Sequence, residues 1–203
     1  MEVFGMQVDF VSLFIFAIAT TFSPGPNTIS SASMGLSFGY RRSLRYLLGI
    51  ALGFFLIMLS CSFLSTFIQI YLPRMVRILS YAGSLYIFYL AYHSFRRGFS
   101  FTRGELKPLG FGRGFMLQIV NPRVIILGLT VYTTFLLRMP HTLTNLIVSA
   151  LGFTLMCFTS ISTWTKFGSL IGRTMQDERS RKIINTILGL FLCYVAIKMV
   201  VQV

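Results

Sequence analysis

The sequence predicts an all-α membrane protein in which six transmembrane helices form two inverted three-helix repeats, with helices 1 and 4 broken at proline. The chain of 203 residues is 55% hydrophobic and only 11% charged, with a mean hydropathy of +0.75, whereas soluble domains carry about 25% charged residues. Its Lys and Arg residues gather between uncharged stretches that are long enough to cross a bilayer. Prolines interrupt two of those stretches.

Uncharged stretches of about 17 to 25 residues or more predict the spans. They lie at residues 10–37, 46–70, 76–94, 114–137, 141–165 and 183–202. We expect the first to remain as a helix rather than to be a cleaved signal peptide, because Glu2 and Asp9 replace the usual positive n-region. The whole chain, 1–203, is therefore expected to be a single transmembrane domain.

The formal charge of +13 indicates membrane orientation rather than nucleic-acid binding. Thirteen of the eighteen Lys and Arg residues follow spans one, three and five. The positive-inside rule places these three connections in the cytoplasm and both termini outside. We expect the bilayer, and no nucleic acid, as the partner of these charges.

The two halves of the chain resemble each other. Residues 51–54, Ala-Leu-Gly-Phe, recur as residues 150–153, and Pro24 in span one corresponds to Pro122 in span four. A repeat of three spans must enter the membrane from the opposite side the second time, so the repeat is inverted. Inverted repeats with interrupted helices are typical of secondary transporters.

The repeat also divides the domain. We expect residues 1–94 to form the first three-helix repeat and residues 114–203 the second. Residues 95–113 between them are rich in glycine and basic side chains, which predicts a flexible cytoplasmic linker.

The proline breaks are the predicted substrate site. Proline in a helix interior costs roughly 3 kcal/mol, and irregular backbone at membrane depth is tolerated where it lines a cavity. A half-helix that restarts there points its free N–H groups and positive end at the cavity, which attracts carboxylates. The predicted substrate-binding residues are Ser23, Pro24, Gly25, Pro26 and Asn27 in span one and Gln118, Asn121, Pro122 and Arg123 in span four. Alternatively, the prolines only kink the helices and the asparagines cap them.

Charge inside the spans limits the possible cargo. Arg123 is the one basic residue in the body of a span, and it either pairs with a substrate carboxylate or reaches the cytoplasmic headgroups. No Asp or Glu lies between Asp9 and Glu105, or between Glu105 and Asp177. A cationic cargo would require such a carboxylate, so the sequence favours a neutral or zwitterionic cargo.

Other residues are expected to serve packing. Gly35 with Gly39, and Gly49 with Gly53, have the G-x-x-x-G spacing that places both glycines on one helix face. We expect these faces to pack against neighbouring helices, with a homodimer through Gly49 and Gly53 as the alternative. Trp164, near the end of a span, is expected to anchor at the membrane interface.

Patterns typical of enzymes are not found in the sequence. It has no H-x-x-x-H cluster, no membrane carboxylate pair and no G-x-S-x-G. The three cysteines, Cys61, Cys157 and Cys193, lie inside spans and are interpreted as small packing residues. We expect no catalytic residue, cofactor or metal.

The motifs resemble those of the LysE/RhtB superfamily of amino-acid exporters. Residues 23–27, Ser-Pro-Gly-Pro-Asn, resemble its first-helix signature, and Gly35, Gly39 and Arg41 follow in its pattern. Residues 121–123, Asn-Pro-Arg, resemble its second-half motif.

Within that family, residues 39–45, 79–83 and 117–121 look most like the cysteine and O-acetylserine exporters, although Ser43 stands where many members have glycine. The resemblance implies efflux of small neutral amino acids from the bacterial cytoplasm, across the inner membrane, by proton antiport.

Other functions remain open at this stage. The cargo could be another amino acid, such as homoserine or threonine. A non-transporting membrane scaffold or assembly factor would use the broken helices only to shape a packing surface. A passive pore would work without a proton gradient.

Overall fold

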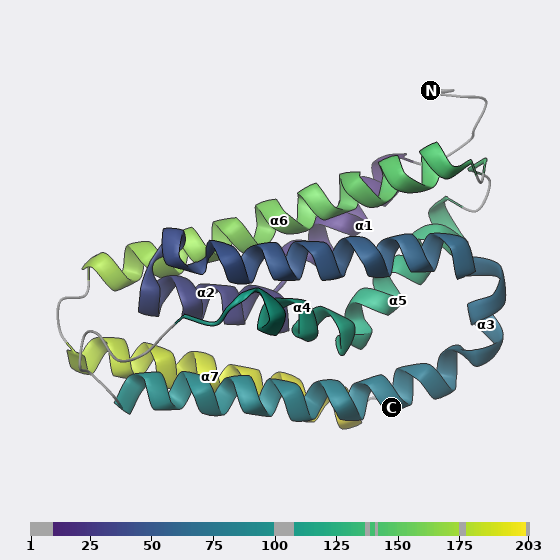
Figure 1. Ribbon diagram of the computed structural model, residues 1–203. Coiled ribbons are helices and arrows are strands. Elements are labelled where there is room, and N and C mark those ends of the chain that lie inside the picture. Colours follow the sequence, from purple (N-terminus) through teal and green to yellow (C-terminus); the bar gives the residue numbers. More distant parts are fainter. Residues whose placement is uncertain (1–9, 100–107, 137–138, 141, 175–177, 202–203) are drawn as a thin grey trace.

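The computed structural model describes residues 10–99, 108–136, 139–140, 142–174 and 178–201, with only the backbone described at 64–80 and at some other helical positions. All regular elements in these ranges are helices (Figure 1). They are α1 (Phe10–Phe22), α2 (Pro26–Phe38), α3 (Tyr40–Phe99), α4 (Phe111–Ile119), α5 (Pro122–Thr130), the π-helical η1 (Val131–Phe135), α6 (Leu143–Thr174) and α7 (Glu178–Val201).

Both predicted breaks are present. α1 and α2 meet at an angle of 49°, and α4 meets the continuous segment of α5 and η1 at 61°. Pro26 is the first residue of α2 and Pro122 the first residue of α5. At this position the missing proline N–H costs no hydrogen bond, and the fixed φ angle suits the start of a helix. The prolines therefore begin the second half of each broken helix.

Two unbroken segments, Tyr40–Phe63 of α3 and Leu143–Gly172 of α6, are long and apolar enough to cross a membrane. Each bent pair also qualifies if it is counted as one span, which gives up to four spans among the described residues. The arrangement of six spans in two inverted repeats remains a prediction. The N-terminal acidic residues and residues 100–107 of the linker lie outside the described residues.

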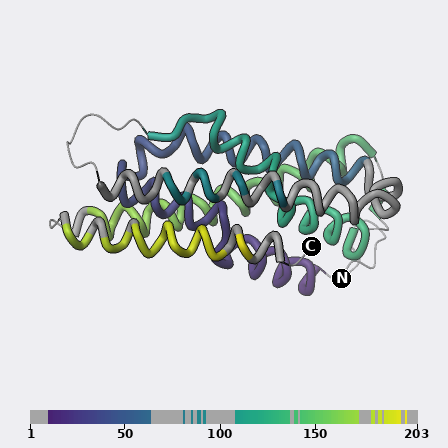
Figure 2. The backbone as a smooth tube through the Cα atoms, turned by 90° about the horizontal axis from the view of Figure 1, so that it is seen from below, coloured from purple at the N-terminus to yellow at the C-terminus, as the bar shows by residue number. Residues whose placement is uncertain are grey.

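The helices form an elongated bundle. α3 folds back on itself, and α7 runs beside its second arm (Figures 1 and 2). α2 packs against α6, and α4 packs against the first arm of α3. At the breaks, Gly25 and Asn121 are buried among these helices, whereas Pro24 is exposed.

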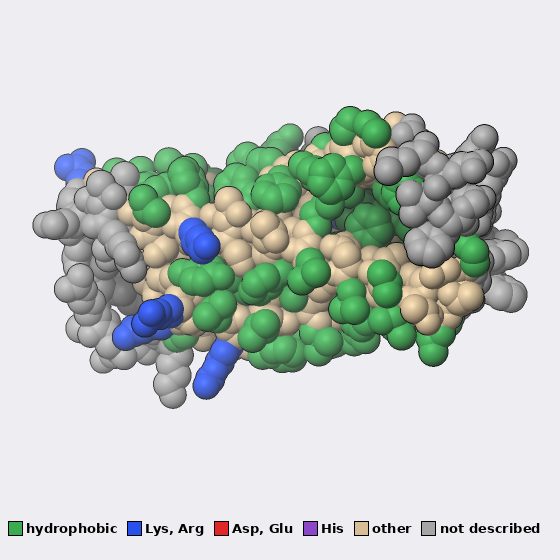
Figure 3. All heavy atoms as spheres, turned by 90° about the horizontal axis from the view of Figure 1, so that it is seen from above, with side chains coloured by type: hydrophobic (Ala, Val, Ile, Leu, Met, Phe, Trp, Pro, Cys, Tyr) green, Lys and Arg blue, Asp and Glu red, His purple; other side chains and the backbone are tan. Residues whose placement is uncertain are grey.

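One end of the bundle carries basic side chains. α2, α3 and α6 end there, and α4 and α7 begin there, whereas α1 begins and α7 ends at the opposite end (Figure 1). Lys and Arg side chains gather toward the first end, while hydrophobic side chains cover much of the same face (Figure 3). The exposed members of the described set are Arg41, Arg42, Arg45, Arg113, Lys166 and Arg179.

Glycines let helix backbones touch at two places. A Cβ atom at Gly35 would overlap the carbonyl of Thr165 in α6, and one at Gly49 would overlap the carbonyl of Phe111 in α4. At Gly53 it would lie 2.7 Å from Cβ of Gln118. α4 of the same chain therefore covers the face formed by Gly49 and Gly53. This face has no free surface left for a dimer.

Gly39 does not have the packing role that its spacing predicts. It is the C-cap of α2, with φ at 77° and its N–H bonded to the carbonyl of Gly35 at 2.8 Å. A side chain is strained at this φ, whereas glycine is not. Its spacing from Gly35 reflects the end of a helix, because Gly39 allows the chain to turn from α2 into α3.

The close contact at Gly35 makes a testable prediction. Gly35→Ala should lower the melting temperature of the purified protein, because an added methyl group forces the α2 and α6 backbones apart, at a cost of about 1–3 kcal/mol. Gly152→Ala is the matched control, since a Cβ there meets no atom within 4 Å. Equal melting temperatures for the two variants would contradict the described packing.

Candidate functional site

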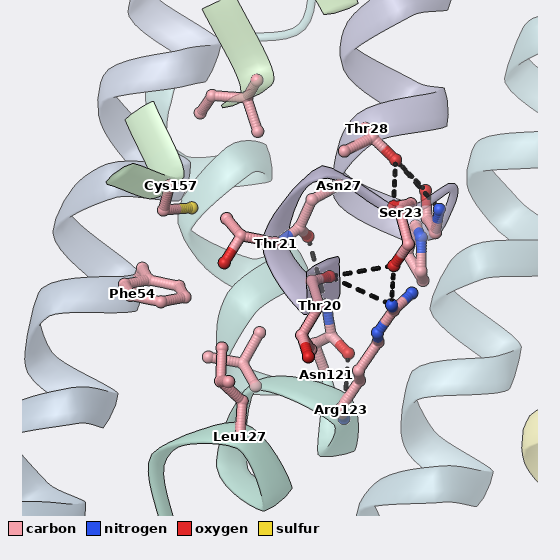
Figure 4. A pocket seen from close by; sticks show the side chains of 14 residues that line it. Thr20, Thr21, Ser23, Asn27, Thr28, Phe54, Asn121, Arg123, Leu127 and Cys157 are labelled. Atoms are coloured by element: carbon pink, nitrogen blue, oxygen red, sulfur yellow. Dashed lines mark hydrogen bonds between the residues drawn. The ribbon is translucent and has the colours of Figure 1, made fainter. Parts of the chain in front are cut away.

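The two helix breaks meet at one place in the bundle. Asn121 Nδ2 donates a hydrogen bond to Asn27 Oδ1 at 3.2 Å. Arg123, two residues further along, donates from Nη1 to the carbonyl of Pro24 at 3.1 Å. Residues from the two proline motifs, 94 to 99 positions apart, are thus joined by direct hydrogen bonds (Figure 4).

Side chains satisfy one backbone N–H group where each second half-helix begins. Asn121 caps α5, because its Oδ1 accepts the N–H of Arg123 at 3.1 Å. In α2, Thr28 Oγ1 accepts the N–H of Gly25 at 2.9 Å. The first backbone bond of α2 runs from Ile29 N–H to the Gly25 carbonyl at 2.9 Å, so the N–H groups of Asn27 and Thr28 have no partner within the helix.

Arg123 points at the first break. Its guanidinium donates to the carbonyl of Thr20 at 3.0 Å, to the carbonyl of Pro24 and to Ser23 Oγ. All three acceptors are neutral oxygens at the C-terminal end of α1, where the helix dipole is negative. Gly25 leaves room for this contact, since a Cβ there would overlap Arg123 Nη1. The Arg123 guanidinium is therefore in direct contact with the first break.

Two side chains of helix α6 donate hydrogen bonds to the remaining carbonyls at this end of α1. Ser160 Oγ donates to the carbonyl of Thr21 at 2.9 Å, and Trp164 Nε1 donates to the carbonyl of Phe22 at 3.2 Å. The sequence predicts Trp164 as an interfacial anchor and does not indicate this hydrogen bond to α1. Its partner lies 142 positions away, so no local pattern could indicate it.

A cavity of about 40 Å³ lies at the junction. The polar lining residues are Thr20, Thr21, Ser23, Asn27, Thr28, Asn121 and Arg123. The apolar ones are Phe54, Val124, Leu127, Cys157 and Ile161, and Gly25 and Pro26 also line the cavity. Phe54, Leu127 and Cys157 lie across the cavity from Ser23 and Arg123 (Figure 4). The cavity thus presents hydrogen-bonding groups and one cation on one side and a small apolar surface on the other.

Comparison with known proteins identifies the family. Residues 18–203 match the family described as LysE type translocator. The chain belongs to the LysE type translocator family. It is 33% identical, over 184 residues, to proteins named cysteine/O-acetylserine efflux protein in Escherichia coli strain K12, Escherichia coli O1:K1 and Shigella flexneri serotype 5b. Each alignment covers 90% of this chain and 93% of the relative.

These relatives of the translocator are efflux proteins and not enzymes. No solved structure matches the chain significantly. The family match spans both helix breaks and every residue that lines the cavity.

The cavity of this LysE type translocator includes most of the residues that the sequence singled out. Six of the nine line it, namely Ser23, Gly25, Pro26, Asn27, Asn121 and Arg123. Pro24 contributes its carbonyl to Arg123, and Pro122 is buried at the start of α5. Gln118 does not line the cavity: its side chain is fully buried beside Gly53, and neither polar atom has a hydrogen-bond partner among the described residues.

Several lining residues were not predicted. Thr20 and Thr21 are polar residues directly before the first break, so extending the motif by one turn would have found them. The apolar members have no such signal, because apolar residues occur throughout a membrane chain. Cys157, which was interpreted as a packing residue, is buried and also forms part of the cavity wall.

Thr28 allows a matched test of the first break. Thr28→Val keeps the size of the side chain but removes the acceptor for the Gly25 N–H, so it should destabilise the protein by about 1 kcal/mol. Thr28→Ser loses one buried methyl group but retains the hydroxyl, so it should be destabilised less than Thr28→Val. Thermal unfolding of the purified translocator measures both variants, and equal melting temperatures would rule out this cap.

Proposed function

We propose that this translocator exports small neutral amino acids, such as cysteine or O-acetylserine, from the cytoplasm. The observation that carries the proposal is the convergence of two helix breaks on one cavity that contains a single cation, Arg123. The names of the relatives support the cargo class. The absence of Asp and Glu between residues 9 and 105 agrees with a cargo that has no net positive charge.

The proposed binding mode divides the cargo between the two walls. The carboxylate pairs with the Arg123 guanidinium and with the free N–H groups at the start of α2, which also present the positive end of the helix dipole. The side chain of the cargo lies against Phe54, Leu127 and Cys157. Carboxylate oxygens would replace the neutral oxygens that Arg123 contacts in the described structure.

Gln118 remains part of the proposed site in a second state. A buried amide without partners costs roughly 1–3 kcal/mol, and Gln118 carries two such atoms in the last turn of α4. Displacement of α4 from Gly53 would bring this amide toward the break at Asn121, where it could bind cargo.

The cavity also suggests how the protein works. About 40 Å³ holds about three water molecules, which is less than an amino acid requires, so transport needs a wider state. We propose six spans in two inverted repeats, residues 1–94 and 114–203, that move against each other to give alternating access. Proton antiport would supply the driving force.

The basic end of the bundle is proposed to face the cytoplasm of a bacterial inner membrane. The exposed Arg and Lys side chains gather at this end, as the positive-inside rule requires of cytoplasmic connections. This orientation places both termini in the periplasm. A homodimer would have to use a surface other than the covered Gly49 and Gly53 face.

Efflux from cells loaded with labelled O-acetylserine or cysteine tests the site. Arg123→Gln and Asn121→Ala should each lower the rate at least about tenfold. The first variant loses a charge-assisted hydrogen bond to the cargo, and the second loses the hydrogen bond between Asn121 and Asn27. Arg45→Gln, at an exposed position, should keep the wild-type rate. Unchanged efflux in both site variants at normal expression would favour a scaffold or a different site.

A protonophore separates the transport mechanisms in the same assay. Proton antiport predicts that the protonophore stops uphill efflux by the wild type. A passive pore would instead give only downhill efflux, at a rate that the protonophore does not change.

Reporter fusions test the orientation. Alkaline phosphatase fused to the C-terminus of the full chain should be active, because this enzyme requires the periplasm, while green fluorescent protein at the same position should be dark. Fusions placed in the 95–113 linker should give the opposite pattern. A fluorescent C-terminal fusion would reverse the proposed topology.

A further inference from the structure

The two halves of the first broken helix are held in different ways. Only Leu13 and Ala17 are buried among the 13 residues of α1, whereas ten of the 13 residues of α2 are buried. α2 is also locked to α6 by direct backbone contact, at Gly35 on α2 and Gly168 on α6. α2 and α6 therefore form one packed unit, and α1 is the loosely packed wall of the cavity.

The inner end of α1 is fixed mainly by side-chain hydrogen bonds. Ser160 and Trp164 are one turn apart on α6 and hold the carbonyls of Thr21 and Phe22. Cys157 and Ile161 on the same stretch of α6 line the cavity. One segment of α6 thus forms a cavity wall and also donates the hydrogen bonds that fix the end of α1.

Cargo entry must change this arrangement if the proposed function is correct. The cavity is too small for an amino acid, so at least one wall has to move. The wall with the least buried surface is α1, and it joins α2 through the non-helical residues 23–25. The bond between Trp164 Nε1 and the Phe22 carbonyl spans this boundary and is a neutral hydrogen bond, which is weaker than the contacts made by a guanidinium.

We propose that Trp164 is a positioning residue of the transport site, whose indole N–H fixes the end of α1 in the narrow state and releases it when cargo widens the cavity. The inference rests on the proposed export function. It assigns to Trp164 a role in the conformational step and not in holding the cargo.

Trp164 supplies its own probe, because it is the single tryptophan in the chain. Tryptophan emission of the full-length wild type, purified into lipid nanodiscs, should shift saturably as O-acetylserine is added. The shift should be absent from Arg123→Gln protein at the same concentrations. Wild-type emission that stays constant while calorimetry shows O-acetylserine binding would overturn the inference.

Transport kinetics separate positioning from simple structural support. Trp164→Phe keeps an aromatic ring but loses the N–H that fixes the narrow state. The wide state that accepts cargo then becomes about fivefold more populated relative to the narrow state, the worth of one neutral hydrogen bond, so KM should fall by up to about fivefold. A merely structural role would lower the amount of active protein and leave KM unchanged. An unchanged or raised KM would contradict this role.

Phe167→Leu is the matched control. The Phe167 ring is exposed and lies edge-on to Trp164, with 6.4 Å between ring centroids. Removing it alters the surroundings of the indole but not the hydrogen bond to Phe22, so both kinetic constants should stay at wild-type values. A fall in KM equal to that of Trp164→Phe would assign the effect to ring packing and overturn the proposal.

The outcomes also distinguish this inference from the proposed function. If the wild type neither binds nor exports O-acetylserine or cysteine, the export function fails and the role of Trp164 fails with it. If the wild type does both, the emission and kinetic results decide the role of Trp164 alone. If Trp164→Phe does not accumulate in membranes, the emission titration of the wild type decides it.

Discussion

Backbone groups that a helix break leaves unpaired inside a membrane must find partners within the protein, and the centre of this molecule is organised around that requirement. The carbonyls at the end of α1 have three donors from the second half of the chain, Arg123 on α5 and Ser160 and Trp164 on α6. Because these donors come from the second half of the chain, satisfying the first break brings the two halves together. The cavity lies where they meet.

The breaks themselves were predictable, because proline has the same local effect wherever it occurs. The motif around Asn121 and Arg123 could be matched to the first break for the same reason, and both residues line the cavity. The contributions of α6 were not predictable, since the partners of Ser160 and Trp164 lie about 140 positions away in sequence. Glycine spacing indicated packing at Gly35 and Gly49 but could not distinguish these sites from the turn at Gly39.

The chemistry of the cavity depends on its one cation and on the absence of a carboxylate among its lining residues. Arg123 is paired with neutral oxygens, so its positive charge is available to an anionic group that enters. A free carboxylate of the cargo would meet this charge together with the open N–H groups of α2. The apolar wall opposite would meet the side chain of the cargo.

The most direct test of the account is whether residues 27 and 121, one from each break, lie side by side. Asn27→Cys and Asn121→Cys would be combined in a chain whose three native cysteines are replaced by alanine, and treated with a short bifunctional thiol reagent. The account predicts rapid cross-linking of the pair. Failure to cross-link would contradict a site shared by the two breaks.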